Sequence, residues 1–328
     1  MNSEPKNIEA WVPVTNEIFQ SQLELVASKV KDPNVGLFGP GSMMWHLSRH
    51  ALIGAHGSGR ALLLQIAHPW VTRGIDEHSN TRNDPLGRAA RTFTTVLSIV
   101  YGSLDQAVRE ALLVHRVHEK IKGAVGANSG AFPEGSEYSA NEANAMLWVH
   151  ATLWETTVTM HEAIIGPISR ADKERFYEET RLFAYMFGIP DEILPPNWHE
   201  FMEYNQRMWD SNQLVVNQAT RELSGFLFDP LHVVLTPAMY WLRVVTAATM
   251  PERLRDEFGF VYGPRERKLF SVGRKAVRIA EPMMPRILRN GPAYIEAQRR
   301  LQGKYSTWLT RKATQALLGR RELVALER

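Results

Sequence analysis

The sequence predicts an all-α fold, a single compact domain built from many helices. Residues that favour helices, Ala, Leu, Arg and Glu above all, are abundant. Gly and Pro lie between long periodic segments and do not punctuate the short alternating segments that strands need. With 328 residues, 44% of them hydrophobic, the chain can bury a substantial core.

The N-terminal part of the chain is expected to form three helices separated by loops. Residues 1–30 are a polar lead into a short amphipathic helix. Gly57 and Gly59 are expected to open a second helix that runs through "RALLLQIA" until Pro69. A turn at "NTRNDP" then precedes a helix from Leu86 to Val100, because its final Asp-Pro pair suits a helix start.

The middle and end of the chain are also expected to form helices joined by loops. One helix is expected from a cap at Ser103 to a stop at Gly123, followed by a loop, "GANSGAFPEGSEYSANE". A long helix from about Ala140 to Ile165 comes next. Further helices are expected at 170–188, 199–216, 218–228, 232–250 and 264–318.

No linker is long enough to separate independent domains, so the organisation is one helical domain with additions at both ends. The expected parts are an N-terminal lead and helix (1–39), a catalytic domain (40–260) and a basic helical C-terminal extension packed on it (261–328).

Charge is distributed unevenly along the chain. Residues 264–328 hold 16 Lys and Arg against 5 Asp and Glu, whereas residues 1–263 hold 22 against 30. The basic segment is either a solvated helix face that balances an acidic body, or a contact for an anionic membrane surface or an acidic partner. No nucleic-acid-binding module is recognisable, so no nucleic-acid partner is expected.

Cysteine is absent, which excludes disulfides, zinc–thiolate sites and cysteine nucleophiles. The N-terminus lacks the pattern of a secretory signal, and the apolar segment Leu231–Met250 contains His, Pro and Arg, so it is expected to be a buried helix and not a membrane span. The expected location is the cytoplasm, with peripheral membrane association left open.

The stretch "HRVHEKIKG" places His115 and His118 on the apolar face of a predicted helix. Each ring is either a core histidine bonded to the backbone or a metal ligand. A di-iron bundle needs Glu-x-x-His on two helices and a zinc protease needs His-Glu-x-x-His, and neither pattern matches. Haem needs one axial histidine on such a face, so haem fits better.

The preceding helix offers a polar side for such a pocket. Arg88, Arg91, Thr92 and Thr95 fall on one helical stripe. Either this stripe is an exposed charged face, or the arginines point inward toward something anionic, such as haem propionates. The apolar residues around Thr92 favour a helix buried over much of its circumference.

Six segments in order along the chain resemble the motifs of one protein family. The family is that of the latex-clearing rubber oxygenases and the MpaB-type oxygenases, and the resemblance covers roughly residues 40–260. Their order makes the match specific. The segments are "LLLQIAHPWV", "HSNTRNDPLGRAARTFTTVLSIVYGS", "RVHEKIKG", "YSANEANAMLWVHATL", "FYEETRLFAYMFGIP" and "LPPNWHEFMEYNQRM".

The resemblance implies a helical protein with a globin-like core that binds haem b. It makes His118 the iron ligand, with His115 one turn away lining or supporting the pocket. It places Arg88, Arg91 and Thr92 on the distal, catalytic side. Rubber oxygenases have a lysine where this chain has Arg91. Since arginine stays cationic, it is expected to donate hydrogen bonds and not to ligate iron.

Two further histidines are candidates for the cofactor pocket. His68, before a proline in "QIAHP", either lines the pocket or caps a helix. His150, in "LWVHATLWE", either faces the haem or belongs to the core, and Tyr138 and Glu155 are weaker candidates.

The implied function is a haem b-dependent oxygenase that uses dioxygen on a small hydrophobic substrate, an isoprenoid, lipid or aromatic compound, with C=C cleavage as one reaction. Rubber polymer is not expected, because rubber oxygenases are exported. The alternatives are a non-catalytic haem-binding or sensor protein, a fold that has lost its cofactor, and a peroxidase-like enzyme, since a distal arginine also suits peroxide chemistry.

Overall fold

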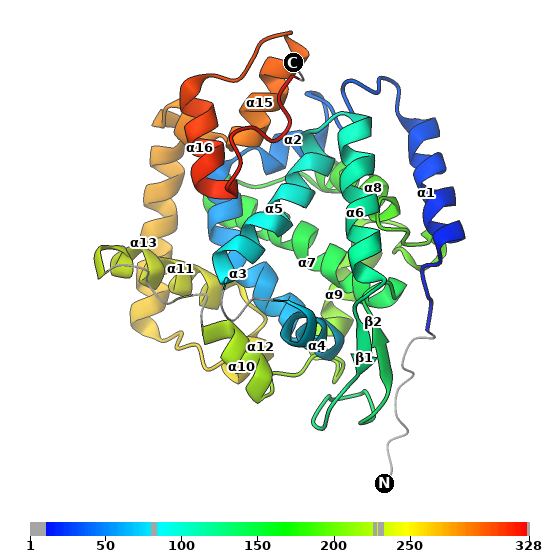
Figure 1. The fold of residues 1–328 in the computed structure, drawn as a ribbon. Coiled ribbons are helices and arrows are strands. Elements are labelled where there is room, and N and C mark those ends of the chain that lie inside the picture. Colours follow the sequence, from blue (N-terminus) through cyan, green and yellow to red (C-terminus); the bar gives the residue numbers. More distant parts are fainter. Residues whose placement is uncertain (1–10, 80–83, 226–227, 229–232, 327–328) are drawn as a thin grey trace.

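The periodic segments fold into helices over most of the chain, which confirms the helical prediction (Figure 1). The structure is a computed structural model that describes residues 11–79, 84–225, 228 and 233–326, and helix accounts for about 68% of it. Part of the predicted turn at "NTRNDP", the end of the predicted helix 218–228 and the start of 232–250 lie outside these residues.

The described residues form sixteen α-helices, four short helical turns and one pair of strands. The α-helices are α1 (Asn16–Lys29), α2 (Met43–Ser48), α3 (Ala51–Ile66), α4 (Pro69–His78), α5 (Pro85–Tyr101), α6 (Leu104–His118), α7 (Ala143–Met160), α8 (Arg170–Tyr185), α9 (Trp198–Asp210), α10 (Gln218–Gly225), α11 (Thr236–Thr249), α12 (Glu252–Glu257), α13 (Pro264–Ala280), α14 (Arg286–Arg289), α15 (Pro292–Leu301) and α16 (Trp308–Leu318). The others are β1 (Lys122–Ala124), β2 (Glu137–Ser139), η1 (His161–Ile165), η2 (Asp191–Ile193), η3 (Val233–Leu235) and η4 (Glu281–Met283).

Helices α3 and α7 pack against each other in the centre of the fold (Figure 1). A Cβ added to Gly57 would lie 2.9 Å from Thr156 Cγ2, so glycine lets the two helices approach closely. The prediction that Gly57 and Gly59 open this helix is wrong: α3 already begins at Ala51, and both glycines lie inside it. Their role is in packing between helices.

A buried ion pair joins the same two helices. Arg60 on α3 and Glu155 on α7 are each 2% exposed, and their side chains are in direct contact. Arg60 Nε also donates to the Thr249 carbonyl (2.8 Å), and Glu155 Oε1 accepts from Thr159 Oγ1 (2.6 Å). Because the charges are paired and hydrogen-bonded, this network avoids the cost of an isolated buried charge.

A small antiparallel hairpin corrects the all-α prediction. β1 pairs with β2 in a register that sets Gly123 opposite Tyr138, within the segment expected to be a helix end and a loop. Consequently α6 ends at His118, and the stop predicted at Gly123 is wrong. A Cβ on Gly123 would lie 3.0 Å from Tyr138 Cε1, so this glycine gives room to the facing ring. The chain leaves the helix after His118 to form the backbone pairing between β1 and β2, which hydrophobic periodicity does not predict.

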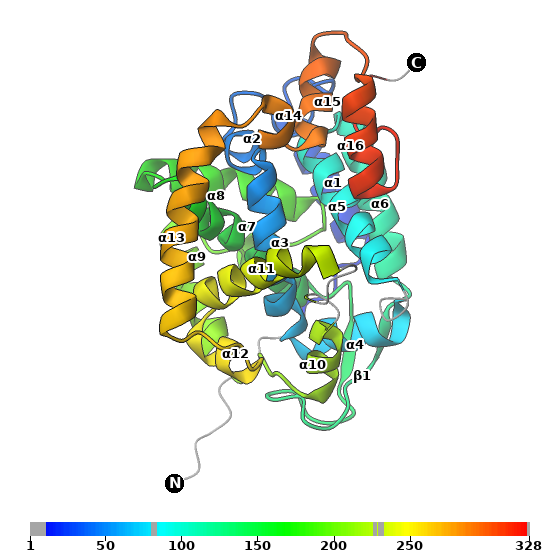
Figure 2. The same cartoon turned by 90° about the vertical axis from the view of Figure 1, so that its left-hand side faces the viewer.

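The predicted helix from Ala140 to Ile165 is α7 followed by one turn of π-helix, η1. Glu142 caps its start, accepting from the Ala145 backbone N–H at 2.7 Å. The predicted helix 264–318 is instead four helices, because Pro285, Pro292 and Gly303 interrupt it. Figure 2 shows α13 on the outside of the fold, beside α11.

In the part of the chain that the structure describes, no helix has both the length and the apolar character to cross a membrane.

Candidate active site

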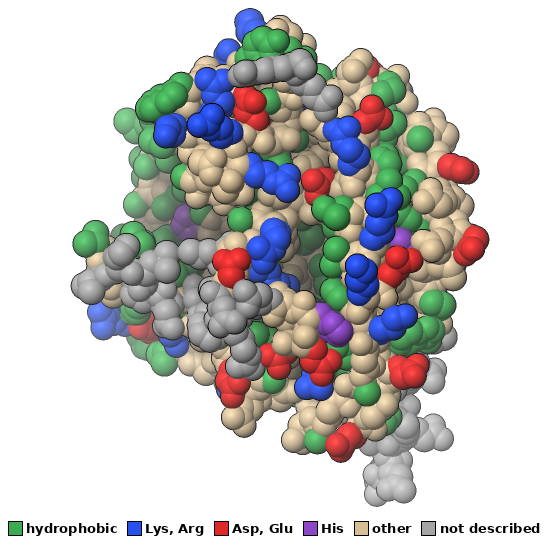
Figure 3. Space-filling view, in the orientation of Figure 1, with side chains coloured by type: hydrophobic (Ala, Val, Ile, Leu, Met, Phe, Trp, Pro, Cys, Tyr) green, Lys and Arg blue, Asp and Glu red, His purple; other side chains and the backbone are tan. Residues whose placement is uncertain are grey.

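Helices α5 and α6 form an antiparallel pair that opens toward one end. α5 ends at Tyr101, α6 begins at Leu104, and a contact of 3.2 Å from Thr95 Oγ1 to Glu110 Oε2 ties them midway. Beyond this contact the helices diverge (Figure 1), and Figure 3 shows the surface hollowed between them, with hydrophobic side chains inside the hollow. The start of α5 and the end of α6, where the predicted site residues lie, are therefore on opposite sides of this hollow.

His118 is the last residue of α6 and half-buried, and its Nδ1 is fully buried without a hydrogen bond of ordinary geometry. Burial lowers the pKa of its imidazole to about 4, helped by nearby His115 and opposed by the Asn141 side chain and the Ala140 backbone. The ring is thus neutral near pH 7. Neutral imidazole is the form that ligates metals.

His115 faces α1. Its ring stacks on Phe19 with centroids 4.0 Å apart and planes 2° apart, and its Nε2 lies 3.0 Å from the Asn16 side-chain oxygen. Burial lowers its pKa as well. These contacts explain the position of His115 by packing against α1, one turn before His118.

Arg88, Arg91 and Thr92 lie on the first half of α5. Arg91 is 62% exposed and pairs with Asp84 at 3.2 Å, while the exposed Thr92 hydroxyl donates to the Arg88 carbonyl (3.2 Å). The expectation that this part of the helix is buried over much of its circumference is wrong at Arg91 and Thr92, which are exposed, and the first fully buried side chain described on α5 is that of Thr94. The apolar residues that suggested it lie mainly in the second half of α5.

Arg88 differs from Arg91, since it is only partly exposed. Desolvation and the positive charge of Arg91 lower its pKa below the ordinary value, and no described carboxylate offsets them. An anionic group placed here would relieve this repulsion.

His68 caps α4. Its Nδ1 accepts the Trp70 backbone N–H (3.3 Å), and its buried ring lies against Trp70 and Phe132. Burial lowers the pKa of His68 to about 3. Of the two interpretations of this residue, the structure therefore supports the cap.

His150 lies on α7 and is 3% exposed. Neither of its ring nitrogens has a hydrogen-bond partner among the described residues. The rings nearest to it are those of Trp154 and Phe183, at centroid distances of 6.3 and 6.2 Å. Burial lowers its pKa to about 3. Buried polar atoms normally have partners, so an unpaired imidazole in the core points to a bound group or water beside it.

Asn141 lies beside the His118 ring, and the sequence did not indicate it. It is buried, its Nδ2 donates to the His115 carbonyl (3.2 Å), and its Oδ1 has no hydrogen-bond partner. Asn141 therefore holds α6 near its end and leaves an acceptor available beside the His118 ring. The motif "YSANE" contained it, but nothing in local periodicity marked an asparagine before a helix cap as a support for histidine.

The surroundings of His118 are suited to a histidine that serves as the single protein ligand of a haem iron. The His118 ring lies near the Asn141 side chain and the Ala140 backbone, and a hydrogen bond from its buried, unpaired Nδ1 to one of them would fix the tautomer and leave Nε2 for iron. Within the described ranges, no three His, Cys, Asp or Glu side chains gather to hold a bare metal ion. A single imidazole beside an apolar hollow suits a prosthetic group better than a multi-ligand metal.

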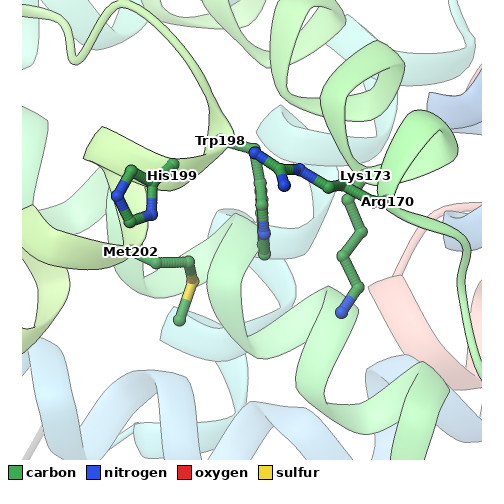
Figure 4. A pocket seen from close by; sticks show the side chains of 5 residues that line it. All are labelled: Arg170, Lys173, Trp198, His199 and Met202. Atoms are coloured by element: carbon green, nitrogen blue, oxygen red, sulfur yellow. The ribbon is translucent and has the colours of Figure 1, made fainter.

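A separate surface pocket of about 440 Å³ lies between the starts of α8 and α9 (Figure 4). It contains none of the predicted site residues. Lys173 in its wall already pairs with Glu162 at 2.9 Å. The lining residues are Arg170, Lys173, Trp198, His199 and Met202.

Comparisons with known proteins agree with the resemblance seen in the sequence. Residues 45–279 match the catalytic domain of "ER-bound oxygenase mpaB/B'/Rubber oxygenase". Two uncharacterized mycobacterial proteins, Mb2261 of Mycobacterium bovis and Rv2237 of Mycobacterium tuberculosis, are each 23% identical over 230 residues, which cover 68% of this chain and 87% of theirs. No solved structure matches. The chain therefore belongs to the MpaB and rubber oxygenase family, a family of oxygenases.

Proposed function

We propose that this protein is a haem b-dependent oxygenase that uses dioxygen on a small hydrophobic substrate, an isoprenoid, lipid or aromatic compound. Family membership supports the oxygenase class. The observation that carries the haem proposal is the neutral ring of His118, which lies beside the Asn141 side chain and whose Nδ1 is buried and unpaired. The globin-like arrangement of the core and a cytoplasmic location belong to the same proposal.

The residues around the hollow have separable roles. His118 would hold the haem iron, and Asn141 would orient the His118 ring. Bound haem supplies the electron chemistry with dioxygen that protein side chains lack. Arg88 and Arg91 would bind propionate or negative charge that develops on the oxygen side. Thr92 lies beside them, and its hydroxyl would have to leave the Arg88 carbonyl to donate to a bound group. Apolar side chains in the hollow would hold the substrate and exclude water.

His150 and His68 would contribute differently. His150 offers two unpaired ring nitrogens from α7, so a cofactor or substrate polar group is a suitable partner for it. His68 would shape the site from its cap position, since its Nδ1 is occupied by the Trp70 backbone.

Haem titration into purified apoprotein tests this function. We expect one equivalent of haem to give a Soret band, and His118→Ala to lose it while retaining the helical circular dichroism. His199→Ala is the matched control, because His199 lies in α9 with a 68% exposed side chain. A Soret band of equal intensity and affinity in His118→Ala would refute His118 as the ligand.

Product analysis then separates oxygenase activity from the alternatives. The reduced holoprotein incubated with dioxygen and an isoprenoid alkene should form aldehydes or ketones that carry oxygen from isotopically labelled dioxygen. Haem binding without turnover of any alkene, lipid or aromatic compound indicates a carrier or sensor. Turnover only with peroxide indicates a peroxidase, and absence of haem binding indicates a fold that has lost its cofactor.

A further inference from the structure

The outer face of α13 carries an exposed apolar stripe that no described segment covers. Spacings of three and four residues place four of its members on one side of α13, and the fifth, Met283, follows in η4. Ile279 and Met283 are 71% and 81% exposed. We name these residues the α13 stripe: Leu269, Val272, Ala276, Ile279 and Met283.

The neighbouring side of α13, about 100° around the helix from the apolar stripe, accounts for how the helix attaches to the protein. Phe270 and Val277 pack against a buried cluster with Trp241 of α11, and Gly273 lies directly against the Trp241 ring. The helix is thus apolar on two sides, of which one is covered. Figures 2 and 3 show α13 at the edge of the molecule, with hydrophobic side chains gathered along that edge.

Cations border the α13 stripe. Lys268, Lys275 and Arg278 each directly precede a stripe residue, so they lie about 100° around the helix from it. Residues 264–289 contain eight Lys and Arg and two Glu.

Both glutamates are turned to partners within the protein. Glu281 is buried against His50, with 2.7 Å from its Oε1 to Nδ1 of the ring. Glu266 accepts from the Gly263 N–H (3.0 Å) and the Tyr240 hydroxyl (3.1 Å). The solvent-facing side of this segment is therefore apolar and cationic.

We propose that the α13 stripe docks the protein onto an anionic lipid surface, with α13 in the plane of the membrane interface. Apolar side chains flanked by Lys and Arg fit the boundary between headgroups and acyl chains. A second copy of the chain fits less well, because its identical cations would repel these. α14 extends the surface with the exposed Leu288 and with Arg286 and Arg289.

Vesicle flotation of the full chain tests this. We expect binding to vesicles of phosphatidylcholine and phosphatidylglycerol in equal parts, and little binding to phosphatidylcholine alone. Val272→Glu/Ile279→Glu and Lys268→Glu/Lys275→Glu should each weaken binding at least about tenfold. The control Leu25→Glu/Lys31→Glu makes the same kinds of change on and after α1, across the molecule from α13 (Figure 1), and should bind like the wild type.

Three results would overturn the proposal. One is equal binding by the wild type and both α13 variants with unchanged circular dichroism. Another is loss of binding in the α1 control alone. The third is a dimer in light scattering that the stripe variant dissociates, which would make a second copy the occupant. Since none of these measurements needs haem or turnover, failure of the proposed function would not affect them.

Discussion

The side-chain amide of Asn141 donates a hydrogen bond of 3.2 Å to the backbone carbonyl of His115, joining residues 26 positions apart. This bond anchors the segment before α7 to the last turn of α6. The Asn141 side chain also lies beside the His118 ring, and Asn141 Oδ1 and His118 Nδ1 are both buried and unpaired. The two atoms are a complementary acceptor and donor, so a hydrogen bond between them would orient the His118 ring.

Asn141→Leu should weaken haem binding by about 10- to 100-fold, because the His118 ring loses its orienting acceptor. Asn141→Asp keeps an oxygen beside the ring and should retain most of the affinity. Haem affinity measured by absorbance titration, together with the reduction potential of the bound haem, checks this. Equal losses of affinity in the two variants would show that Asn141 supports the local fold and does not orient the ring.

Gly57→Ala should destabilise the protein by about 1–3 kcal/mol, because the added methyl would lie 2.9 Å from Thr156 Cγ2 and 3.1 Å from Met160 Cγ. Gly54→Ala, on the same helix with no atom within 4 Å, should instead stabilise by up to about 1 kcal/mol. Urea denaturation measures both free energies of unfolding. Similar changes in the two variants would mean that contact between α3 and α7 is not what selects glycine.

Arg60→Met should cost about 3–5 kcal/mol of unfolding free energy, because it leaves the Glu155 carboxylate buried without its counter-charge. Arg60→Met/Glu155→Leu should recover much of that loss. Arg175→Ala is the comparison on the surface, where the 61% exposed Arg175 pairs with Asp172, and should cost less than about 1 kcal/mol. A double variant as unstable as the single one would show that Glu155 does not carry the penalty.

His150→Phe should make stability less sensitive to acid. In the unfolded chain the residue takes up a proton as the pH falls through its ordinary pKa of 6.5, whereas in the folded protein burial holds the pKa to about 3. Between these values the unfolded state binds more protons, so stability falls as the pH falls. In unfolding measured from pH 7 to 3, the variant should take up about one proton fewer on unfolding than the wild type, so its stability should fall less steeply as the pH falls. An unchanged slope would indicate that the folded protein protonates His150 in this range.

The local sequence pattern predicts the start of a helix well where a capping residue bonds the backbone of the turn beside it. α5 and α6 begin at Asp and Ser caps, and both starts were predicted within one residue, because a cap acts on the turn beside it. Gly57 was misassigned for the opposite reason. Its function depends on Thr156, a residue on another helix.

The candidate site divides in the same way. The sequence pattern and the family resemblance indicated His118, Arg88 and Arg91, since each belongs to a recognisable segment. Asn141 was missed, because its bond to the His115 carbonyl exists only once the hairpin has turned the chain back on α6. The exposure of Thr92 was also unforeseen, since neighbouring apolar residues do not reveal which half of a helix is covered.

The sequence by itself determined the helical class and the basic C-terminal segment, because periodicity, capping and charge are properties of neighbouring residues. Only the tertiary structure decided which apolar faces pack against other segments and which glycines lie where two helices pack closely. It also decided which polar atoms are buried without a hydrogen-bond partner. These depend on contacts between distant segments. An uncovered stripe on α13 and an unpaired nitrogen on His118 both emerge from that packing.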